Sequence, residues 1–447
     1  MRFVSTRGNS LPATLSEVLL NGAVPGGGLY MPEALPQAPL DELDPGSPLA
    51  EFAATLLGPF FAGDSLEPEL SQICTEAFDF PVPIHVPDPS RPQLRVLELF
   101  HGPTAAFKDF GARFLMGCFN RLEAQGPLTV LAATSGDTGG AVGCAAEGQS
   151  SLDAVILFPA GRVSPLQEQQ LTCWGDNVLA AEVQGDFDDC QRLVKEAFCD
   201  ERLTRQHRLT SANSINIGRL LPQLAYIAWA ALRVRSETGE TPGLIIPTGN
   251  LGHGVAALLA RAMGVPIGPV VLATNANRTL KDWKESGRFE PRASIATLAN
   301  AMDVGNPSNF ERLQRLPSET RQVRVERVGD DEIKIRINVE YAASDYVWCP
   351  HSATAVEAWA RQPDRRDRPW IAAATAHPYK FAEVVEPIIA SKLTPNAALA
   401  SIAGRQTRKA TIPARIEALT RILREGMDSR SDCQGSRTRA AAHGGTA

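Results

Sequence analysis

The sequence predicts an α/β protein with two open, mainly parallel sheets that are covered by helices on both faces. Three observations support this prediction. Apolar runs of strand length alternate with helical stretches from Leu94 onward, several runs are apolar at almost every position, and glycine-rich turns follow some of them. Apolar runs without alternation are typical of parallel strands buried on both faces. The chain has 447 residues, of which 44% are hydrophobic, which suffices for two full-sized cores.

The composition excludes several classes of function. A formal net charge of -6 gives no electrostatic basis for binding nucleic acid or an anionic membrane surface. The N-terminus lacks the apolar core of a signal peptide, and no apolar run is long enough to span a membrane. The eight cysteines show neither a Cys-x-x-Cys pair nor a histidine spacing suited to zinc. We therefore expect buried free thiols, no metal site and a cytoplasmic location.

The elements follow from local patterns, taken along the chain. Residues 1–90 are rich in proline and glycine, and apolar spacing predicts two short helices in them, Ser16–Leu20 and Leu49–Leu57. The strands expected next are Leu94–Phe100, Leu128–Thr134, Leu152–Pro159, Val178–Val183, Leu209–Asn213, Gly243–Pro247, Val270–Thr274 and Trp370–Thr375. The helices expected between them are Lys108–Glu123, Ser164–Trp174, Phe187–Glu201, Asn216–Val234, Gly254–Met263 and Phe381–Ala390. A capping box with proline at the first helical position supports the helix start at Ser164.

One lysine stands where a strand passes into a helix. In the stretch His101-Gly-Pro-Thr-Ala-Ala-Phe-Lys-Asp-Phe-Gly111, small and apolar residues surround Lys108 at the expected helix start. Partial desolvation and the positive end of the helix both disfavour an ammonium group and lower its pKa. A neutral amine is what Schiff-base chemistry requires. Taken alone, a lysine at this position is far more often a solvated residue of a first helical turn than a catalytic one.

Two further loops follow strands and open helices. The first, Thr134-Ser-Gly-Asp-Thr-Gly-Gly140, offers hydroxyls and backbone N–H groups at a helix start, which suits a carboxylate or a phosphate. The second, Pro247-Thr-Gly-Asn-Leu-Gly-His-Gly254, lets the backbone approach an anion closely but lacks the Walker lysine and the dinucleotide glycine spacing. This predicts a phosphate cup. Either loop alone is also consistent with an ordinary strand-to-helix turn.

A reactive lysine, a phosphate cup and a second anion-binding loop are together the requirements of pyridoxal phosphate chemistry. The stretch His101–Asp109 resembles the cofactor-lysine signature of threonine synthases, a family in the tryptophan-synthase-β-like class of pyridoxal phosphate enzymes. Further stretches resemble family motifs in the family's order: Gly27–Glu33, Thr134–Gly139, Asn213–Asn216, Gly249–Gly252, Asn300–Ser308, Pro350–His351 and Thr375–Pro378. The sequence departs from the family at Gly26, Thr248, Leu251 and His253.

The resemblance implies a fold and a reaction. The fold is tryptophan-synthase-β-like, with pyridoxal 5'-phosphate in the cleft between the two α/β domains. The reaction is the conversion of O-phospho-L-homoserine and water to L-threonine and phosphate by β,γ-elimination and replacement, with Lys108 as the Schiff-base residue and proton shuttle. A monomer or homodimer is expected. The boundaries expected are an N-terminal segment at 1–90, a catalytic region of two subdomains at 91–426 and a disordered tail at 427–447.

The resemblance also implies residues that contact the cofactor. The cup Gly249, Asn250, Leu251 and Gly252 is expected to hold its phosphate. His253 either adds a donor to that phosphate or is a solvated residue of the helix start. Asp137 either borders the ring hydroxyl or caps its own helix. Thr375 either meets the ring nitrogen or is a buried threonine bonded to its own backbone.

Five residues are expected to bind the substrate. Ser135 and Thr138 are assigned to its carboxylate. Asn213, Ser214 and Arg219, with Asn250 nearby, are assigned to its phosphate, because Arg219 can swing back from the helix toward the strand end. The alternative is that Asn213 and Ser214 cap the helix and Arg219 is a surface charge. In that case another cation, Arg113 or Lys281, holds the phosphate.

Two other functions remain open from the sequence. The first is a phosphohomoserine phospho-lyase or serine/threonine dehydratase, which ends in ammonia and a 2-oxo acid. The second is a binding protein that has kept the fold and lost the chemistry. Retention of Lys108 and of both glycine loops argues against the second.

Overall fold

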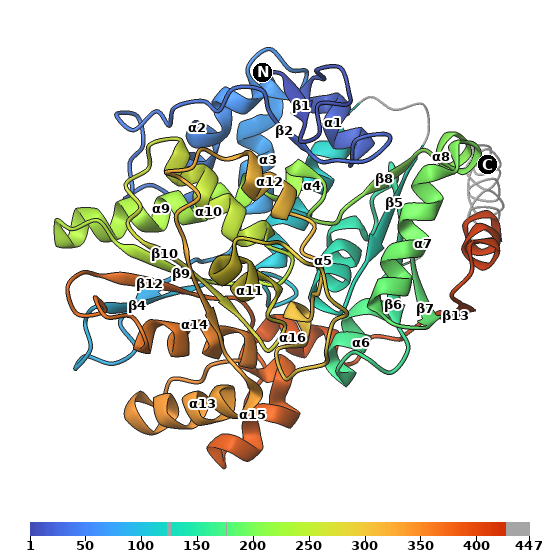
Figure 1. Cartoon of the computed structure of the whole chain (residues 1–447). Coiled ribbons are helices and arrows are strands. Elements are labelled where there is room, and N and C mark those ends of the chain that lie inside the picture. The colour runs from blue at the N-terminus through green and yellow to red at the C-terminus, as the bar shows by residue number, and fades with distance from the viewer. Residues whose placement is uncertain (123–126, 176, 426–447) are drawn as a thin grey trace, which may run out of the picture. The chain divides into compact units, whose positions relative to one another are not determined.

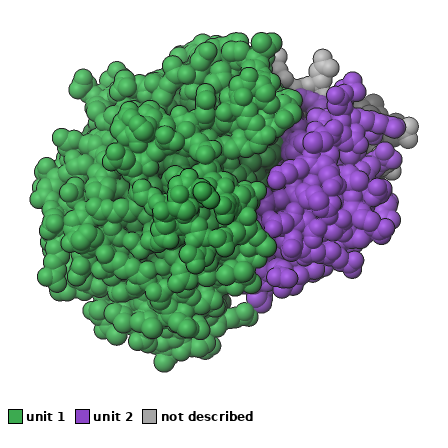
Figure 2. All heavy atoms as spheres, viewed as in Figure 1, with its two compact units in different colours: residues 1–123, 211–404 green, residues 124–210, 405–447 purple. Residues whose placement is uncertain are grey.

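The computed structural model describes residues 1–122, 127–175 and 177–425. Contacts divide the chain into two compact units, which Figure 2 colours separately. Unit 1 comprises Met1–Glu123 and Ser211–Gly404, and unit 2 comprises Ala124–Thr210 and Arg405–Ala447. Each unit contains a mainly parallel sheet, so the prediction of two such sheets is confirmed. The N-terminal 90 residues belong to unit 1, and the expected tail at 427–447 lies outside the described residues.

The sheet of unit 1 has six strands in the order β11-β10-β9-β12-β4-β3. Figure 1 labels four of them, β10, β9, β12 and β4. Only β3 is antiparallel to its neighbour. The strands are β3 (Ile84–His85), β4 (Leu94–Glu98), β9 (Gly243–Pro247), β10 (Val270–Thr274), β11 (Arg324–Arg327) and β12 (Trp370–Ala374). Every residue of β9, β10 and β12 is buried, as expected for parallel strands that are covered on both faces.

The sheet of unit 2 has five strands in the order β13-β7-β6-β5-β8. The strands are β5 (Leu128–Ala133), β6 (Leu152–Pro159), β7 (Val178–Gln184), β8 (Leu209–Ser211) and β13 (Ala410–Pro413). The pairs β5–β6, β6–β7 and β7–β13 are all parallel. A small antiparallel pair, β1 (Phe3–Ser5) and β2 (Tyr30–Pro32), lies in the N-terminal part of unit 1.

Helices surround both sheets. Those of unit 1 are α1 (Leu15–Asn21), α2 (Leu49–Phe61), α3 (Leu70–Ala77), α4 (Lys108–Arg121), α9 (Leu221–Thr238), α10 (Gly252–Ala262), α11 (Thr279–Ser286), α12 (Phe310–Arg315), α13 (Asp330–Ser344), α14 (Pro350–Ala360), α15 (Ala382–Ile389) and α16 (Ala397–Ile402). Those of unit 2 are α5 (Asp137–Ala146), α6 (Pro165–Thr172), α7 (Phe187–Cys199) and α8 (Glu201–His207). Short 3-10 turns are η1 (Glu67–Glu69), η2 (Ile217–Arg219), η3 (Asn300–Met302) and η4 (Pro378–Phe381). In the N-terminal region α2 packs against α3 and α9.

All eight predicted strands are confirmed within two residues at each end, but four predicted helices need correction. The helix expected at Leu49–Leu57 continues to Phe61 as α2. The helix expected at 187–201 ends at Cys199, because the Asp200 side chain accepts N–H groups of the following turn and starts α8. The helix expected from Asn216 is a 3-10 turn followed by α9, and the one expected from Phe381 begins after η4. Helix α13 and edge strand β11 were not predicted.

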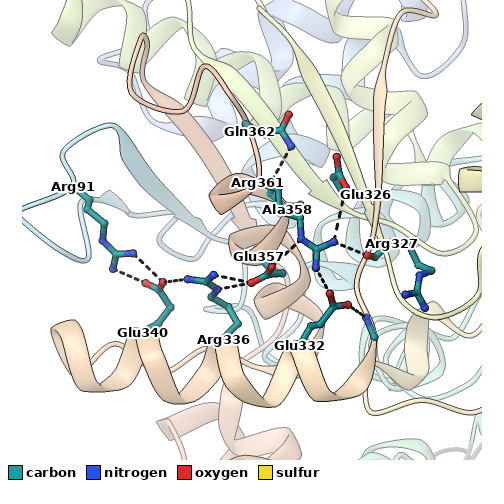
Figure 3. Close-up of polar contacts among 11 residues, drawn as sticks. Arg91, Glu326, Arg327, Glu332, Arg336, Glu340, Glu357, Ala358, Arg361 and Gln362 are labelled. Atoms are coloured by element: carbon teal, nitrogen blue, oxygen red, sulfur yellow. Dashed lines mark hydrogen bonds and ion pairs between the residues drawn. The ribbon is translucent and has the colours of Figure 1, made fainter.

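Alternating charges hold α13 and α14 together (Figure 3). Arg91 forms two hydrogen bonds with Glu340, at 2.9 and 2.7 Å, and the Glu340 side chain has no exposed surface. Arg336 bonds both Glu340 and Glu357, and Arg361 continues the row from Glu357. Although burial acts to raise the pKa of Glu357, the bonds from both arginines hold it below the ordinary value. The network therefore ties the segment before β4 to two helices.

The cysteines in the described part of the chain are free thiols. Five of the seven are buried, as predicted, but Cys144 is half-buried and Cys199 is exposed because it ends α7 on its solvent face. Cys433 lies outside the described residues. Within those residues, no helix combines the length and the apolarity needed to cross a membrane.

Candidate active site

Lys108 is the first residue of α4, so the predicted position at a strand-to-helix junction is confirmed. Its side chain is partly exposed, and its Nζ lies 4.5 Å from the centre of the Phe107 ring. Phe107 in turn stacks on the imidazole of His253, with 4.8 Å between ring centres. Lys108 and His253, the residue after the glycine cup, therefore both lie against the ring of Phe107.

His253 is the most unusual polar residue of this region. Its side chain is 4% exposed, which contradicts one of the two alternatives for it, a solvated residue of the helix start. Burial and then the charge of Lys108 lower the pKa of His253 to about 3, so the ring is neutral at pH 7. Among the described residues neither ring nitrogen has a hydrogen-bond partner. A buried imidazole without hydrogen bonds is unfavourable, so we expect a bound group or a water molecule to supply the partner of each ring nitrogen.

The loop between β9 and α10 has the close-packed form expected of a phosphate cup. A Cβ atom on Gly249 would lie 2.7 Å from Cα of Met302, and one on Gly252 would lie 3.2 Å from Cβ of Ser214. Leu251 has a φ of 65°, a left-handed conformation that turns the chain into the helix. The first N–H groups of α10 lack intrahelical acceptors and are available to an anion.

Asn250 and Ser214, two predicted residues from separate segments, are in direct contact. Nδ2 of Asn250 donates to Oγ of Ser214 at 3.0 Å, and Oδ1 of Asn250 accepts the N–H of Ser308 at 2.6 Å. Asn309 donates from Nδ2 to the same Ser214 hydroxyl at 3.0 Å and to the Asn250 carbonyl oxygen at 3.1 Å. The cup and the Asn213–Ser214 loop are therefore one hydrogen-bonded structure.

Arg312 supports this structure and was not predicted. It is fully buried, and its guanidinium donates to the carbonyl oxygens of Tyr30, Ser214 and Ile215 and to Oδ1 of Asn309. Burial lowers the pKa of Arg312 to about 9, which leaves it a cation at pH 7. Asn309 and Arg312 follow directly after the Asn300–Ser308 motif. Extending that motif by four residues would have included Arg312 among the candidates.

Arg219 is buried, at 3% exposure, rather than a surface charge. It belongs to η2 and not to a long helix, and its guanidinium reaches back to the carbonyl oxygen of Ala212 at the strand end, the direction that the sequence predicted. Burial lowers its pKa to about 10. Its Nε has no hydrogen-bond partner in the described part of the chain and lies against Gly111 in α4. The cap of η2 is Asn216, so neither Asn213 nor Ser214 has the capping role that was the alternative.

The two substitute cations are engaged elsewhere. Arg113 bonds the carbonyl oxygens of Glu76 and Ala77 and pairs with Asp79. Lys281 donates to the carbonyl oxygen of Val325 at 3.0 Å. Both side chains are therefore bonded to groups outside the Asn213–Arg219 segment.

Thr375 follows β12 directly and is 5% exposed. Its carbonyl oxygen accepts the N–H of Phe107 at 2.8 Å, which places it beside the residue that precedes Lys108. Its own N–H donates to Oγ of Ser352 at 2.9 Å, and the two hydroxyl oxygens are 3.5 Å apart. The hydroxyl thus faces another side chain, in contrast to the alternative of a bond to its own backbone.

In unit 2 the loop after β5 opens α5, as predicted. The Thr134 hydroxyl accepts N–H groups from Gly136, at 2.9 Å, and Gly139, at 3.0 Å. Asp137 is buried and accepts Nε2 of Gln167 at 3.2 Å. Gln167 also completes the predicted capping box of α6.

Ser135 and Thr138 are half-buried. Both lie in unit 2 with Asp137, whereas the other predicted site residues lie in unit 1. Unit 1 therefore brings together Lys108, the cup, His253, Ser214 and Thr375. Unit 2 contains the other loop that the sequence predicted to bind an anion, Thr134–Gly140. The roles assigned to these residues stay predictions.

Comparison with known families identifies three matching regions. Residues 93–370 match the family model described as pyridoxal-phosphate dependent enzyme. Residues 2–78 match the model of the threonine synthase N terminus, and residues 352–423 match that of the threonine synthase C-terminal region. The three matches cover most of the chain and include every predicted site residue.

Curated relatives and solved structures agree with these matches. The chain is 36% identical to threonine synthase of Serratia marcescens over 95% of its own length and 99% of the relative. It is 35% identical to that of Escherichia coli, with the same coverage. The crystal structure of the Escherichia coli threonine synthase superposes with a TM-score of 0.89 and 34% identity, covering 95% of this chain and 100% of that one. A pyridoxal-phosphate-bound threonine synthase from Brucella melitensis gives a TM-score of 0.86 at 32% identity, covering 95% of this chain and 99% of that one.

Proposed function

Because the chain belongs to the threonine synthase family of pyridoxal-phosphate-dependent enzymes, we propose that it forms L-threonine and phosphate from O-phospho-L-homoserine and water. The observation that carries the proposal is the position of Lys108 at the start of α4, with the Gly249–Gly252 cup and the orphaned imidazole of His253 beside it in one unit.

The residues of unit 1 fit pyridoxal phosphate. The first N–H groups of α10 have no intrahelical acceptors, and no Cβ fits at Gly249 without movement of Met302. The cup Gly249, Asn250, Leu251 and Gly252 would hold the cofactor phosphate, with neutral His253 donating one N–H. Thr375 would offer its hydroxyl to the ring nitrogen. When bound, the cofactor supplies an electron sink for a carbanion at the substrate Cα.

Lys108 is assigned the covalent link to the cofactor and, once released, the proton transfers. Its Nζ lies 4.5 Å from the centre of the Phe107 ring, at the N-terminus of α4. An amine in this setting removes a proton from Cα and returns protons along the carbon chain. Removal of a well-placed acid–base group costs about 10²- to 10⁴-fold in rate.

The substrate phosphate needs a cationic site distinct from the cofactor cup. Arg219 is assigned to it because Nε is buried and orphaned, and Asn213 and Ser214 supply polar groups at the same strand end. Departure of phosphate from Cγ increases its charge, so a fixed guanidinium stabilises the transition state more than the ground state. In unit 2, Ser135 and Thr138 are assigned to the substrate carboxylate and Asp137 to the cofactor ring hydroxyl.

The test is product identification with purified protein, pyridoxal phosphate and O-phospho-L-homoserine. We expect threonine and phosphate in equal amounts, without 2-oxobutyrate. Lys108→Ala should abolish both turnover and covalent retention of the cofactor, whereas Lys392→Ala, at an exposed lysine, should change neither. Formation of oxo acid and ammonia instead of threonine would identify a phospho-lyase or dehydratase. A protein that stays colourless with cofactor would remove the enzymatic proposal.

A cytoplasmic location and a monomeric or homodimeric state complete the proposal. The free thiols Cys74, Cys118, Cys173, Cys190 and Cys349 suit a reducing compartment. Burial raises the pKa of Cys190 to about 12, so this thiol stays protonated and unreactive. Sedimentation of the purified protein measures the oligomeric state, and a tetramer or larger assembly would contradict it.

A further inference from the structure

The loop that delivers Lys108 to the start of α4 is attached to the segment after β12. Phe107 donates its N–H to the Thr375 carbonyl oxygen at 2.8 Å, and His377 donates to the Ala105 carbonyl oxygen at 3.0 Å. These bonds hold the C-terminal part of the loop. Ala105 also donates its N–H to the Gly102 carbonyl oxygen at 3.0 Å, so both backbone groups of this residue are bonded where the chain turns toward the helix.

That turn occurs at Ala105, which has a φ of 54°. An L-residue with a side chain is disfavoured in this left-handed region, and surrounding contacts must maintain it. Ala105 is fully buried, three positions before Lys108. A relaxation of this residue to negative φ would redirect the chain and displace the first turn of α4.

In addition to these backbone bonds, two buried charged side chains hold the turn through Thr104. The Asp109 carboxylate accepts the Thr104 N–H at 2.9 Å and the Thr104 hydroxyl at 2.6 Å. From the other side, Nζ of Lys380 donates to the Thr104 carbonyl oxygen at 2.9 Å. A buried carboxylate and a buried ammonium therefore bond the two ends of one residue.

Both charges are expensive to place where they are. Asp109 has no exposed surface and Lys380 is 2% exposed. Burial raises the pKa of Asp109, while the bonds from Thr104 and the charge of Lys380 oppose that rise. Because apolar residues of similar volume often stabilise a core as well as buried charges do, the burial of these two charges is weak evidence for a role in stability alone.

We propose that Lys380 is a positioning residue for the reactive lysine: together with Asp109 it clamps Thr104, keeps Ala105 in its left-handed conformation and so fixes Lys108 at the helix start. The inference rests on the proposed function only in the role it gives Lys108. Lys380 lies in η4, far along the chain from Lys108, and the clamp therefore couples the β12 end, where Thr375 lies, to the loop of the reactive amine.

The test separates positioning from general stability by using Ala105 as a reporter. Lys380→Met removes the ammonium and retains an apolar chain of similar length. We measure the rate at which apoprotein and pyridoxal phosphate form the covalent link, by absorbance, and the fraction of Lys108 peptide that carries the borohydride-fixed cofactor, by mass spectrometry. A displacement on the scale of 1 Å predicts a fall in this rate of about 10- to 100-fold. Lys392→Met, at an exposed lysine, is the matched control and should leave the rate unchanged.

The same substitution in an Ala105→Gly background gives the decisive comparison. Glycine adopts positive φ without steric cost, so the loss caused by Lys380→Met should shrink several-fold when measured against Ala105→Gly alone. An equal loss in both backgrounds, or no loss in the single variant, overturns the proposal. If Lys380→Met does not fold, Thr104→Val, which removes only the hydroxyl bond to Asp109, carries the same comparison with the same criteria.

The outcomes for the clamp and for the proposed function are independent. Formation of the covalent link at Lys108 reports on the clamp, whereas the identity of the product reports on the reaction. A wild-type protein that links the cofactor to Lys108 and yields oxo acid would contradict the proposed reaction and leave the clamp to be judged by the Ala105 comparison.

Discussion

The cup is expected to fail when a single methyl group is added to Gly249. A Cβ at this position would lie 2.7 Å from Cα of Met302, 3.0 Å from its carbonyl oxygen and 3.1 Å from its carbonyl carbon. All three are backbone atoms, which cannot rotate away. Carbon atoms in favourable contact are about 3.5 Å or more apart, so the loop or η3 must move by about 0.8 Å.

This displacement sets the size of the effect of Gly249→Ala. Overpacking of this kind costs about 1–3 kcal/mol. If the cup moves to relieve it, cofactor binding weakens by the same amount, which corresponds to an increase in Kd of about 5- to 150-fold. Gly252→Ala should have a smaller effect, because its Cβ would lie 3.2 Å from Cβ of Ser214, so a movement of only about 0.3 Å relieves the contact.

The assay is titration of the apoprotein with pyridoxal phosphate, followed by absorbance, with urea unfolding of the same apoproteins. Gly404→Ala is the control, since a Cβ there meets no atom within 4 Å. A Kd for Gly249→Ala within twofold of the wild type would refute the reasoning and place the cofactor phosphate elsewhere. An equal increase in Kd for Gly404→Ala would show that the effect of Gly249→Ala does not come from the contact with Met302.

Three further predictions concern charge. Glu340→Gln should lower the free energy of unfolding by about 3 kcal/mol or more, because it breaks buried bonds to Arg91; an unchanged urea midpoint would contradict this. Below pH 6.5 His253 is protonated in the unfolded chain but stays neutral in the folded protein, where its pKa is about 3. The free energy of unfolding should therefore fall by about 1.4 kcal/mol for each pH unit below 6.5. His253→Gln should flatten that slope between pH 6.5 and 5, and a parallel pH profile would argue against the buried neutral ring. Arg219→Ala should reduce kcat/KM for O-phospho-L-homoserine by about 10²-fold or more with unchanged cofactor absorbance at Lys108, and wild-type kinetics would assign the phosphate to another cation.

The strands could be predicted because their apolar sequences indicate that they are buried. Val270–Thr274 and Trp370–Ala374 are apolar at nearly every position, which in a chain of this length occurs where both faces of a parallel strand are covered. Edge strand β11 could not be predicted in the same way. Its sequence Arg324-Val-Glu-Arg327 is mostly charged, and its place depends on pairing with β10.

Helix α13 was missed for a related reason. Asp330–Ser344 distributes charged and apolar residues around the helix, with Ile335 and Val339 exposed, and so lacks a clear apolar face. Much of its attachment comes from Arg336 and Glu340, whose partners lie on other segments of the chain. Contacts of this kind depend on tertiary structure and leave no local periodicity.

The residues of the candidate site also fall into those that the sequence could predict and those that depend on tertiary contacts. Lys108, the two glycine loops and Thr375 could be found because each stands at the end of a predicted strand or the start of a predicted helix. Arg312 and Lys380 could not, because a charged residue in sequence is read as solvated unless its partner is known. The depth of burial of Arg219 and His253 was likewise not predictable, since it depends on α4 and Phe107 packing over them.

The most direct test of the account is turnover of O-phospho-L-homoserine in water enriched in the heavy oxygen isotope. The proposed reaction breaks the bond between Cγ and oxygen and adds water at Cβ. The account therefore predicts the heavy isotope in the hydroxyl group of threonine and none in the released phosphate, as measured by mass spectrometry. Heavy oxygen in the phosphate, with homoserine as the product, would show simple hydrolysis of the phosphate ester and would contradict the central claim.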